Sequence, residues 1–185
     1  MMTIGHSTLP IESFLRALKD SDCTLLVDVR RHPGSRRHPQ YSQQQLFAYL
    51  EKEGIQAMWR EGLGGRRTAQ KDSINMGWQN ESFRGYADYM QTQEFRDHLD
   101  WLMGQRELSN TVIMCAEAVP WRCHRSLIGD AVLARGGVVE DIFVLGDGRS
   151  SRKPHKMTVF AQVSEGRLFY PPPQAALFPV DSRRS

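Results

Sequence analysis

The sequence predicts an α/β domain, a three-layer Rossmann-like fold in which helices flank a mostly parallel sheet. Short apolar runs alternate along the chain with segments whose apolar residues recur at helical spacing, and this alternation is typical of parallel sheets covered by helices. The length of 185 residues suits one domain with a sizeable core. A hydrophobic fraction of 40% and a charged fraction of 24% are those of an ordinary globular protein.

The first third of the chain contains five expected elements. Apolar residues at 9–22 recur at helical spacing, whereas those at 23–30 form the continuous run of a strand buried on both faces. Ser42 with Gln45 three residues later matches the capping-box pattern of a helix start, and Gly54 is a good helix terminator. The expected elements are strands at 1–7, 23–30 and 55–60 and helices at 9–22 and 42–54.

The rest of the chain continues the alternation after a long loop. Residues 61–82 are rich in Gly, Arg, Asn and Ser, and loops of this length in compact domains are usually functional. The next elements are expected to be one or two helices within 82–105, a strand at 111–115, a helix at 122–135 and a strand at 138–145. A polar stretch at 146–158 follows, and one hairpin is expected within 159–173. We expect a single domain over 1–170 and a loosely ordered tail at 171–185.

The composition excludes several classes of protein. No run approaches the eighteen or so apolar residues of a membrane span, and no basic start with an apolar stretch resembles a signal peptide. Three cysteines argue against a disulfide scaffold and for free thiols. We therefore expect a cytoplasmic protein with no membrane partner.

Arginine is concentrated in two short segments, although the net charge of +3 is mild. The clustered basic residues are Arg30, Arg31, His32, Arg36, Arg37 and His38 in one segment and Arg66 and Arg67 in "GGRR". The planar fork of arginine suits bidentate binding of phosphate or carboxylate. The segments thus predict anion binding and a phosphate-bearing partner, and a solvated basic face is the structural alternative.

The stretch VIMCAEAVPWRCHR (112–125) contains an unusual concentration of side chains that can react or bind ligands: two cysteines, a glutamate, a histidine and two arginines. Because ligands bind at the carboxyl ends of parallel strands, its side chains should meet those that follow the first two strands. The expected catalytic residues are His6, Cys115, Glu117, Cys123 and His124. The expected substrate-binding residues are Arg30, Arg31, Arg36, Arg37, Tyr86, Arg122 and Arg125, with Ser7 and Asp28 as polar support. Taken singly, Asp28 is better explained as a buried partner of an arginine and Cys115 as a core residue.

Several known mechanisms do not fit the spacing of these residues. An oxyanion-binding thiol loop often has an arginine six positions after its cysteine, but Trp121 and Gly129 occupy those positions here. Fingerprints for dinucleotides, P-loops and serine nucleophile elbows are missing. The eight-residue separation of Cys115 and Cys123 is unusual for zinc. The main interpretation therefore assigns no metal ligand and leaves the cofactor unknown.

The sequence nevertheless resembles a known family. The segments that carry the resemblance are TIGHS, LLVDVR, LGGRR, FRGYADYM, PHKMT and above all MCAEAVPWRCHR. They are similar to Domain of Unknown Function 488, a family of bacterial and archaeal proteins. The resemblance implies a compact α/β domain and a signature of His6, Asp28, Arg30, Arg36, Tyr86, Cys115, Glu117, Cys123, His124 and Arg125. Similar sequences often have a histidine where this chain has Glu140 or Asp141, and the family implies no settled activity.

The leading hypothesis is a small enzyme that acts on a phosphate-bearing, nucleotide-like or nucleic-acid-derived substrate, by hydrolysis or by transfer. Glu117 near His6 or His124 would supply acid/base chemistry, and arginines would neutralise the anion. One alternative is a non-catalytic nucleic-acid-binding module built on loop 30–37 with Arg66 and Arg67. Another is a metal-binding protein that uses Cys115, Cys123 and His124, and a third is a purely structural motif. Substrate, reaction and oligomeric state stay open.

Overall fold

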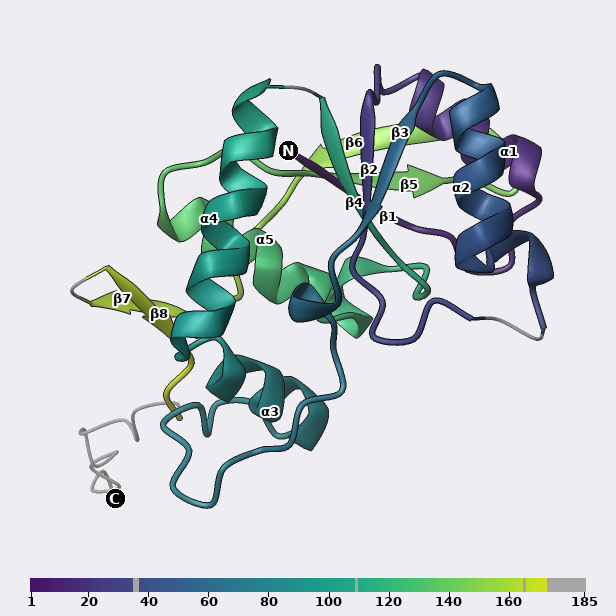
Figure 1. The fold of residues 1–185 in the computed structure, drawn as a ribbon. Coiled ribbons are helices and arrows are strands. Elements are labelled where there is room, and N and C mark those ends of the chain that lie inside the picture. Colours follow the sequence, from purple (N-terminus) through teal and green to yellow (C-terminus); the bar gives the residue numbers. More distant parts are fainter. Residues whose placement is uncertain (35–36, 109, 165, 173–185) are drawn as a thin grey trace, which may run out of the picture.

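A six-stranded sheet forms the centre of the computed structural model, which describes residues 1–34, 37–108, 110–164 and 166–172 (Figure 1). The strands are β1 (Met2–Gly5), β2 (Leu25–Asp28), β3 (Gln56–Trp59), β4 (Thr111–Cys115), β5 (Glu140–Val144) and β6 (Ser150–Pro154). Their order in the sheet is β3-β2-β4-β1-β5-β6. All neighbours pair in parallel except β5 with β6. The predicted mostly parallel α/β fold is confirmed.

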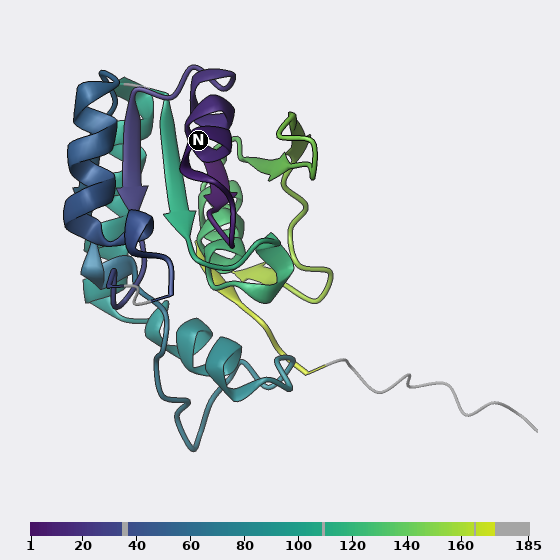
Figure 2. The ribbon, with the colours of Figure 1, turned by 90° about the vertical axis from the view of Figure 1, so that its right-hand side faces the viewer.

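Helices cover both faces of the sheet and complete three layers (Figure 2). The helices are α1 (Ile11–Lys19), α2 (Gln43–Lys52), α3 (Glu81–Tyr89), α4 (Gln93–Leu108) and α5 (Arg125–Ala134). Helices α1 and α2 pack against the face of β2 that carries Leu26. Residues of α3, α4 and α5 pack against Leu25 and Val27 on the opposite face. Apolar residues on both faces explain the unbroken apolar run of β2.

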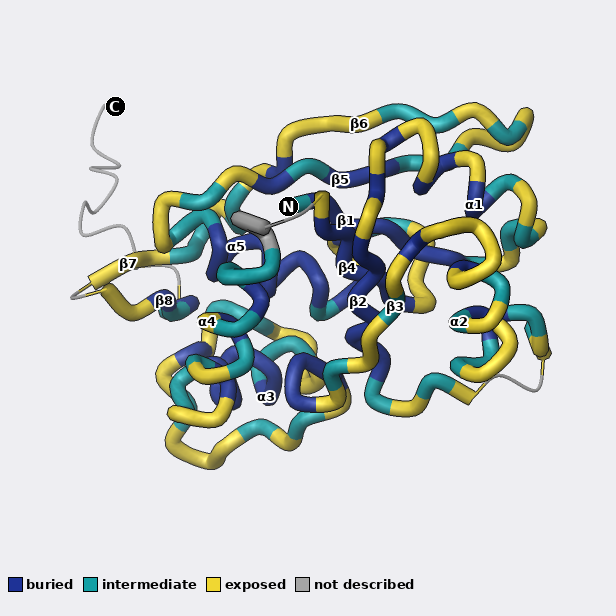
Figure 3. The backbone as a smooth tube through the Cα atoms, turned by 45° about the horizontal axis from the view of Figure 1, so that its top comes forward, coloured by how far each residue is buried: buried dark blue, intermediate teal, exposed yellow. Residues whose placement is uncertain are grey.

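Three local features differ from the sequence-based picture. Strand β6 forms in the polar stretch 146–158, where no strand was predicted, because an edge strand needs only a backbone partner and its side chains face solvent (Figure 3). Ser42 precedes α2 but makes no capping hydrogen bond through its side chain. Helix α5 begins at Arg125 rather than near Arg122, since residues 120–122 form a separate 3₁₀ turn.

The C-terminal part contains the expected hairpin. It consists of β7 (Gln162–Ser164) and β8 (Arg167–Phe169), which pair antiparallel in a separate two-stranded sheet. Of the tail expected at 171–185, residues 173–185 lie outside the described residues. Within the described ranges, no helix combines the length and apolar character that crossing a bilayer requires.

The topology places several loops at one edge of the sheet. Strand β4 lies between β2 and β1, and the three run in parallel, so their carboxyl ends meet. Helix α3 and the loop before it lie beyond this edge (Figure 2). At the end of β1, an ideal Cβ on Gly5 would lie 1.7 Å from the carbonyl oxygen of Glu117. Only glycine allows the chain after β4 to approach β1 so closely.

Candidate functional site

A cleft of about 340 Å³ opens at the carboxyl edge of the sheet. We call it the arginine cleft; its lining residues are Arg30, Arg31, His32, Gly65, Arg66, Ser82, Phe83, Cys115, Ala116, Glu117, Arg122, Cys123 and His124. These residues follow β2, β3 and β4 or begin α3, so the fold brings together positions that are far apart in the sequence. The predicted site residues Arg30, Arg31, Cys115, Glu117, Arg122, Cys123 and His124 are among them.

Two thiols and one imidazole form the most compact cluster in the cleft. Sγ of Cys115, Sγ of Cys123 and Nδ1 of His124 all lie within 4.8 Å of one another. Nδ1 is 4.0 Å from Sγ of Cys115 and 3.6 Å from Sγ of Cys123. On the other side of the ring, Nε2 lies 2.9 Å from the carbonyl oxygen of Val29. A carbonyl only accepts, so Nε2 carries the proton and the Nδ1 lone pair faces the sulfurs.

The two thiols of this cluster differ in acidity. Burial raises the pKa of Cys123, but hydrogen bonding from Cys115 and the positive charge of Arg125 outweigh burial and lower this pKa to about 7. The pKa of Cys115 is raised, because its hydrogen bond to Cys123 holds its proton and because it is buried. Cys123 is therefore the more readily ionised of the two thiols, and thiolate is the nucleophilic form of cysteine.

Arg30 lies at the floor of the cleft and is bound mainly to the protein. Its Nη2 donates to Asp28 at 2.6 Å, and its Nη1 donates to the carbonyl of Tyr41 at 2.8 Å. The Asp28 side chain is fully buried, as expected for the partner of a buried arginine. Arg30 thus fixes the loop after β2, and it presents only a small part of its guanidinium to the cleft.

His6 contacts Arg30 and does not line the cleft. Its Nε2 lies 3.3 Å from Nη1 of Arg30, and its ring stacks on Tyr41 with centroids 4.1 Å apart. Because arginine can only donate, Nε2 accepts and Nδ1 donates to the carbonyl of Ser7. Burial and the charge of Arg30 lower the pKa of His6 to about 4, so the ring is neutral at physiological pH.

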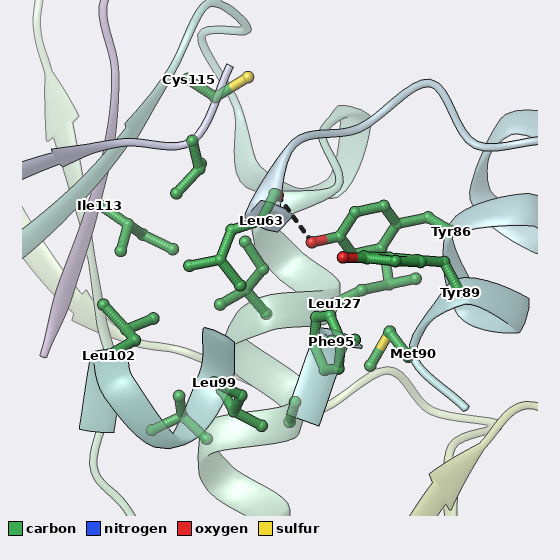
Figure 4. Packing of buried hydrophobic residues seen from close by; sticks show 14 of the residues in the cluster. Leu63, Tyr86, Tyr89, Met90, Phe95, Leu99, Leu102, Ile113, Cys115 and Leu127 are labelled. Carbon is green, nitrogen blue, oxygen red and sulfur yellow. Dashed lines mark hydrogen bonds between the residues drawn. The ribbon is translucent and has the colours of Figure 1, made fainter. Parts of the chain in front are cut away.

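Two predicted substrate-binding residues have inward-facing side chains. Arg125 is buried, and its two Nη atoms donate to the carbonyls of Glu117 and Ala118, which fixes the loop that carries Glu117. Tyr86 is fully buried, and its hydroxyl donates to the carbonyl of Leu63 in the apolar cluster below the cleft (Figure 4). Neither side chain lines the cleft. Both support its walls.

The remaining predicted residues are placed as follows. Ser7 lies at the same sheet edge, where its backbone N–H donates to the carbonyl of Ala116, and Arg37 is exposed outside the cleft lining. Arg36 lies outside the described residues. Arg67, part of the nucleic-acid hypothesis, covers the ring of Tyr89 at 3.5 Å and donates to backbone carbonyls. The basic surface available to a nucleic acid is therefore smaller than the sequence suggested.

Three arginines present charge to the cleft from three different loops. Arg31 follows β2 and lies 3.6 Å from Glu61 in a solvent-accessible ion pair, whereas Arg66 follows β3 and Arg122 precedes α5. Arg66 and Arg122 are exposed and make no ion pair with any residue that the structure describes. Sequence reasoning gave Arg66 a role only in the nucleic-acid-binding alternative and not in the predicted site. The signal that could have assigned it to the site was the GGRR segment within a long loop.

Other lining residues carried no sequence signal of a site. His32 was noted in the basic cluster and as a possible completing metal ligand, but not among the predicted site residues. Ser82 and Phe83 join the cleft because Asn80 caps α3 and directs its first turn there. An ideal Cβ on Gly65 would lie 2.8 Å from Nδ1 of His124, so this glycine allows the loop to pass close to the imidazole.

Comparison with protein families gives one match. The family described as "Domain of unknown function DUF488" matches residues 10–132, more than half of the chain. The matched part includes every lining residue of the arginine cleft. Searches of curated proteins and of solved structures return no match.

Proposed function

Because this chain belongs to the family of Domain of unknown function DUF488, whose description names no activity, we propose a function from the geometry of its cleft. The protein is an enzyme that binds a phosphate-bearing substrate, nucleotide-like or derived from nucleic acid, in the arginine cleft. It hydrolyses this substrate or transfers a group from it.

One observation carries the proposal: Arg31, Arg66 and Arg122 line the same cleft from three separate loops. Guanidinium groups gathered in one cleft repel one another, and a bound anion removes this repulsion. Phosphate offers several acceptor oxygens to their donors, and arginine binds it in a bidentate manner. The cleft volume of about 340 Å³ is within the usual range of small-molecule sites.

The same cleft offers groups suited to chemistry on the bound anion. Glu117 is an exposed carboxylate on the wall and is suited to act as a general base. Cys123, whose pKa is lowered to about 7, and the imidazole of His124 also lie on the lining. The arginines would also stabilise charge that develops in the transition state.

A binding experiment tests the anion site. Inorganic phosphate, adenosine monophosphate and a short oligonucleotide are titrated into the protein by calorimetry at low salt. Arg122→Ala should weaken binding about tenfold or more, because a hydrogen bond to a charged group is worth roughly 1.5–3 kcal/mol. Arg149→Ala is the matched control, since Arg149 is exposed, pairs with Asp147 and does not line the cleft. Equal affinities for the two variants, or no binding of any probe, would refute the anion site.

A turnover experiment tests the catalytic part. Phosphate monoesters, diesters and nucleotides are screened for product formation, and the best substrate is used for kinetics. Glu117→Gln should lower kcat by about 10²–10⁴ with little change in substrate affinity if Glu117 is the base. Binding without turnover of any compound would instead support the non-catalytic nucleic-acid-binding alternative.

A further inference from the structure

We propose that Cys115, Cys123 and His124 bind a thiophilic divalent metal ion, zinc being the natural occupant, with one coordination position open to the arginine cleft. The proposal goes beyond the phosphate-binding function and does not depend on it. Sequence analysis assigned no metal ligand in its main interpretation because the cysteines do not form a closely spaced pair. The fold, rather than the spacing, brings the three ligands together.

The distances suit tetrahedral zinc. Zinc–sulfur bonds of about 2.3 Å and zinc–nitrogen bonds of about 2.0–2.1 Å place ligand atoms roughly 3.5–3.8 Å apart at tetrahedral angles. The separations from Nδ1 of His124 are 3.6 Å to Sγ of Cys123 and 4.0 Å to Sγ of Cys115. All three ligand atoms lie within 4.8 Å of one another. Closing around an ion therefore requires movements of about 1 Å or less between the ligand atoms, which side-chain rotation can supply.

The imidazole is held in the orientation that metal binding requires. Nε2 of His124 donates to the carbonyl of Val29 at 2.9 Å, so the free lone pair is on Nδ1. Histidines that bind metals almost always donate their second N–H to a carbonyl, a carboxylate or water, which fixes the tautomer and the ring plane. Val29 follows β2, the strand beside β4, so the central sheet itself holds the ring.

The ligands stand on rigid elements. Cys115 is the last residue of β4, and His124 is the residue directly before α5. Both cysteines are buried, yet each lines the cleft, so an ion can enter from solvent. A side chain at position 65 would place its Cβ only 2.8 Å from Nδ1 of His124. Because Gly65 has no Cβ, the space beside this nitrogen stays free.

The donor set points to the class of metal and the kind of site. Two thiolates and one imidazole favour zinc and related soft ions over magnesium or calcium, which prefer oxygen ligands. Structural zinc sites have four protein ligands, whereas catalytic sites have three and leave the fourth position to water or substrate. Here the open position would face the same cleft as Arg122 and Glu117, where an oxygen of a bound anion could reach it.

Metal analysis of the purified protein tests the site. After treatment with a chelator, the protein is equilibrated with micromolar zinc, dialysed and measured by elemental analysis. Wild type and the control Cys23→Ser, which changes a buried cysteine on the other face of the sheet, should each hold about one zinc per chain. Cys115→Ser should bind zinc at least tenfold more weakly. A wild type without bound zinc, or a folded Cys115→Ser variant with unchanged affinity, would overturn the proposal.

Cobalt substitution keeps the test decisive even if a variant does not fold. Co²⁺ bound to wild type should show thiolate-to-cobalt charge-transfer absorption and the visible bands of tetrahedral coordination. A spectrum without charge-transfer absorption would exclude the two cysteines as ligands. Arg122→Ala separates the two proposals, because it should lose phosphate affinity and keep zinc. Zinc binding without phosphate binding would refute only the proposed function, and the reverse result would refute only the metal site.

Discussion

At the scale of single residues, the ion pair of Asp28 and Arg30 shows how a charged group becomes part of the fold. Arg30 was predicted to bind substrate, but three of its nitrogens donate to protein acceptors. Both side chains are buried, so neither can exchange its partner for water. The pair holds the beginning of the loop that carries Arg31 into the cleft. Arg30 therefore has a structural role in the site in addition to being one of its lining residues.

Removing one member of this pair should destabilise the protein strongly. Asp28→Ala leaves the buried guanidinium uncompensated and should lower the free energy of unfolding by about 3–5 kcal/mol, measured by urea denaturation. Glu53→Ala breaks the solvent-exposed pair with Lys19 and serves as the control, with an expected loss of about 1 kcal/mol or less. A loss below 1 kcal/mol for Asp28→Ala would contradict the structural role of the pair.

His155 is the centre of a second buried ion-pair network and does not line the cleft. Nδ1 lies 2.8 Å from Asp141 and Nε2 lies 3.2 Å from Asp130. Burial lowers the pKa of His155, but the hydrogen bonds and charges of the two carboxylates outweigh burial and raise it to about 9. Asp141 also accepts a hydrogen bond from the hydroxyl of Thr3, so its carboxylate joins β1 to the His155 network.

This network predicts a pH dependence of stability. The pKa of His155 is raised on folding from an ordinary 6.5 to about 9, so its contribution is complete below pH 6.5 and is lost as the pH rises through 9. The contribution should be roughly 3–4 kcal/mol, at about 1.36 kcal/mol per pKa unit. Urea denaturation of wild type and His155→Gln should therefore show a stability difference that shrinks between pH 6.5 and 9. A difference that is constant over this range would contradict the assignment.

At the scale of elements, Asp88 of α3 fixes the long loop that precedes the helix. Its carboxylate accepts hydrogen bonds from the backbone of Gln70, the hydroxyl of Ser73 and the amide of Asn75. The Asp88 side chain is therefore an anchor for the segment that carries Gly65 and Arg66 over the cleft.

Loss of this anchor should loosen the loop and leave the core intact. Asp88→Ala should increase amide hydrogen exchange in residues 64–80 while exchange in β2 and β4 is unchanged, because the loop depends on these bonds more than the sheet does. Asp97→Ala is the matched control, since Asp97 is an exposed residue of α4 whose carboxylate accepts a hydrogen bond from the exposed Gln93. If residues 64–80 exchange as slowly in Asp88→Ala as in Asp97→Ala and wild type, contacts other than those of Asp88 hold the loop.

The elements also show what sequence reasoning can and cannot predict. Buried strands such as β2 and β4 were predictable because both faces require apolar residues, which gives an unmistakable run. Strand β6 was missed because exposed edge strands carry no such pattern. Cys115 and Glu117 were placed correctly at the carboxyl edge because this depends only on parallel strands. Tyr86 and Arg125 were expected in the cleft, but tertiary packing turns their side chains inward, and no local pattern reveals that direction.

At the scale of the whole molecule, the order of the strands in the sheet brings the site residues together. The chain inserts β4 between β1 and β2, so the loops after β2 and β4 are neighbours although nearly ninety residues separate the ends of these strands. Ligand sites of open α/β sheets lie at the carboxyl ends of strands for this reason. Arginines from separate loops then line the same cleft as the two thiols and the imidazole. The central claim is that an anion binds between these arginines.

Crystals of the protein, grown without sulfate or phosphate and soaked in tungstate, test this claim most directly. Tungstate has the shape and charge of phosphate, and its anomalous scattering locates it without bias. We predict one tungstate in the arginine cleft, within hydrogen-bond distance of at least two of Arg31, Arg66 and Arg122. A cleft without tungstate in crystals where the anion occupies other sites would contradict the account.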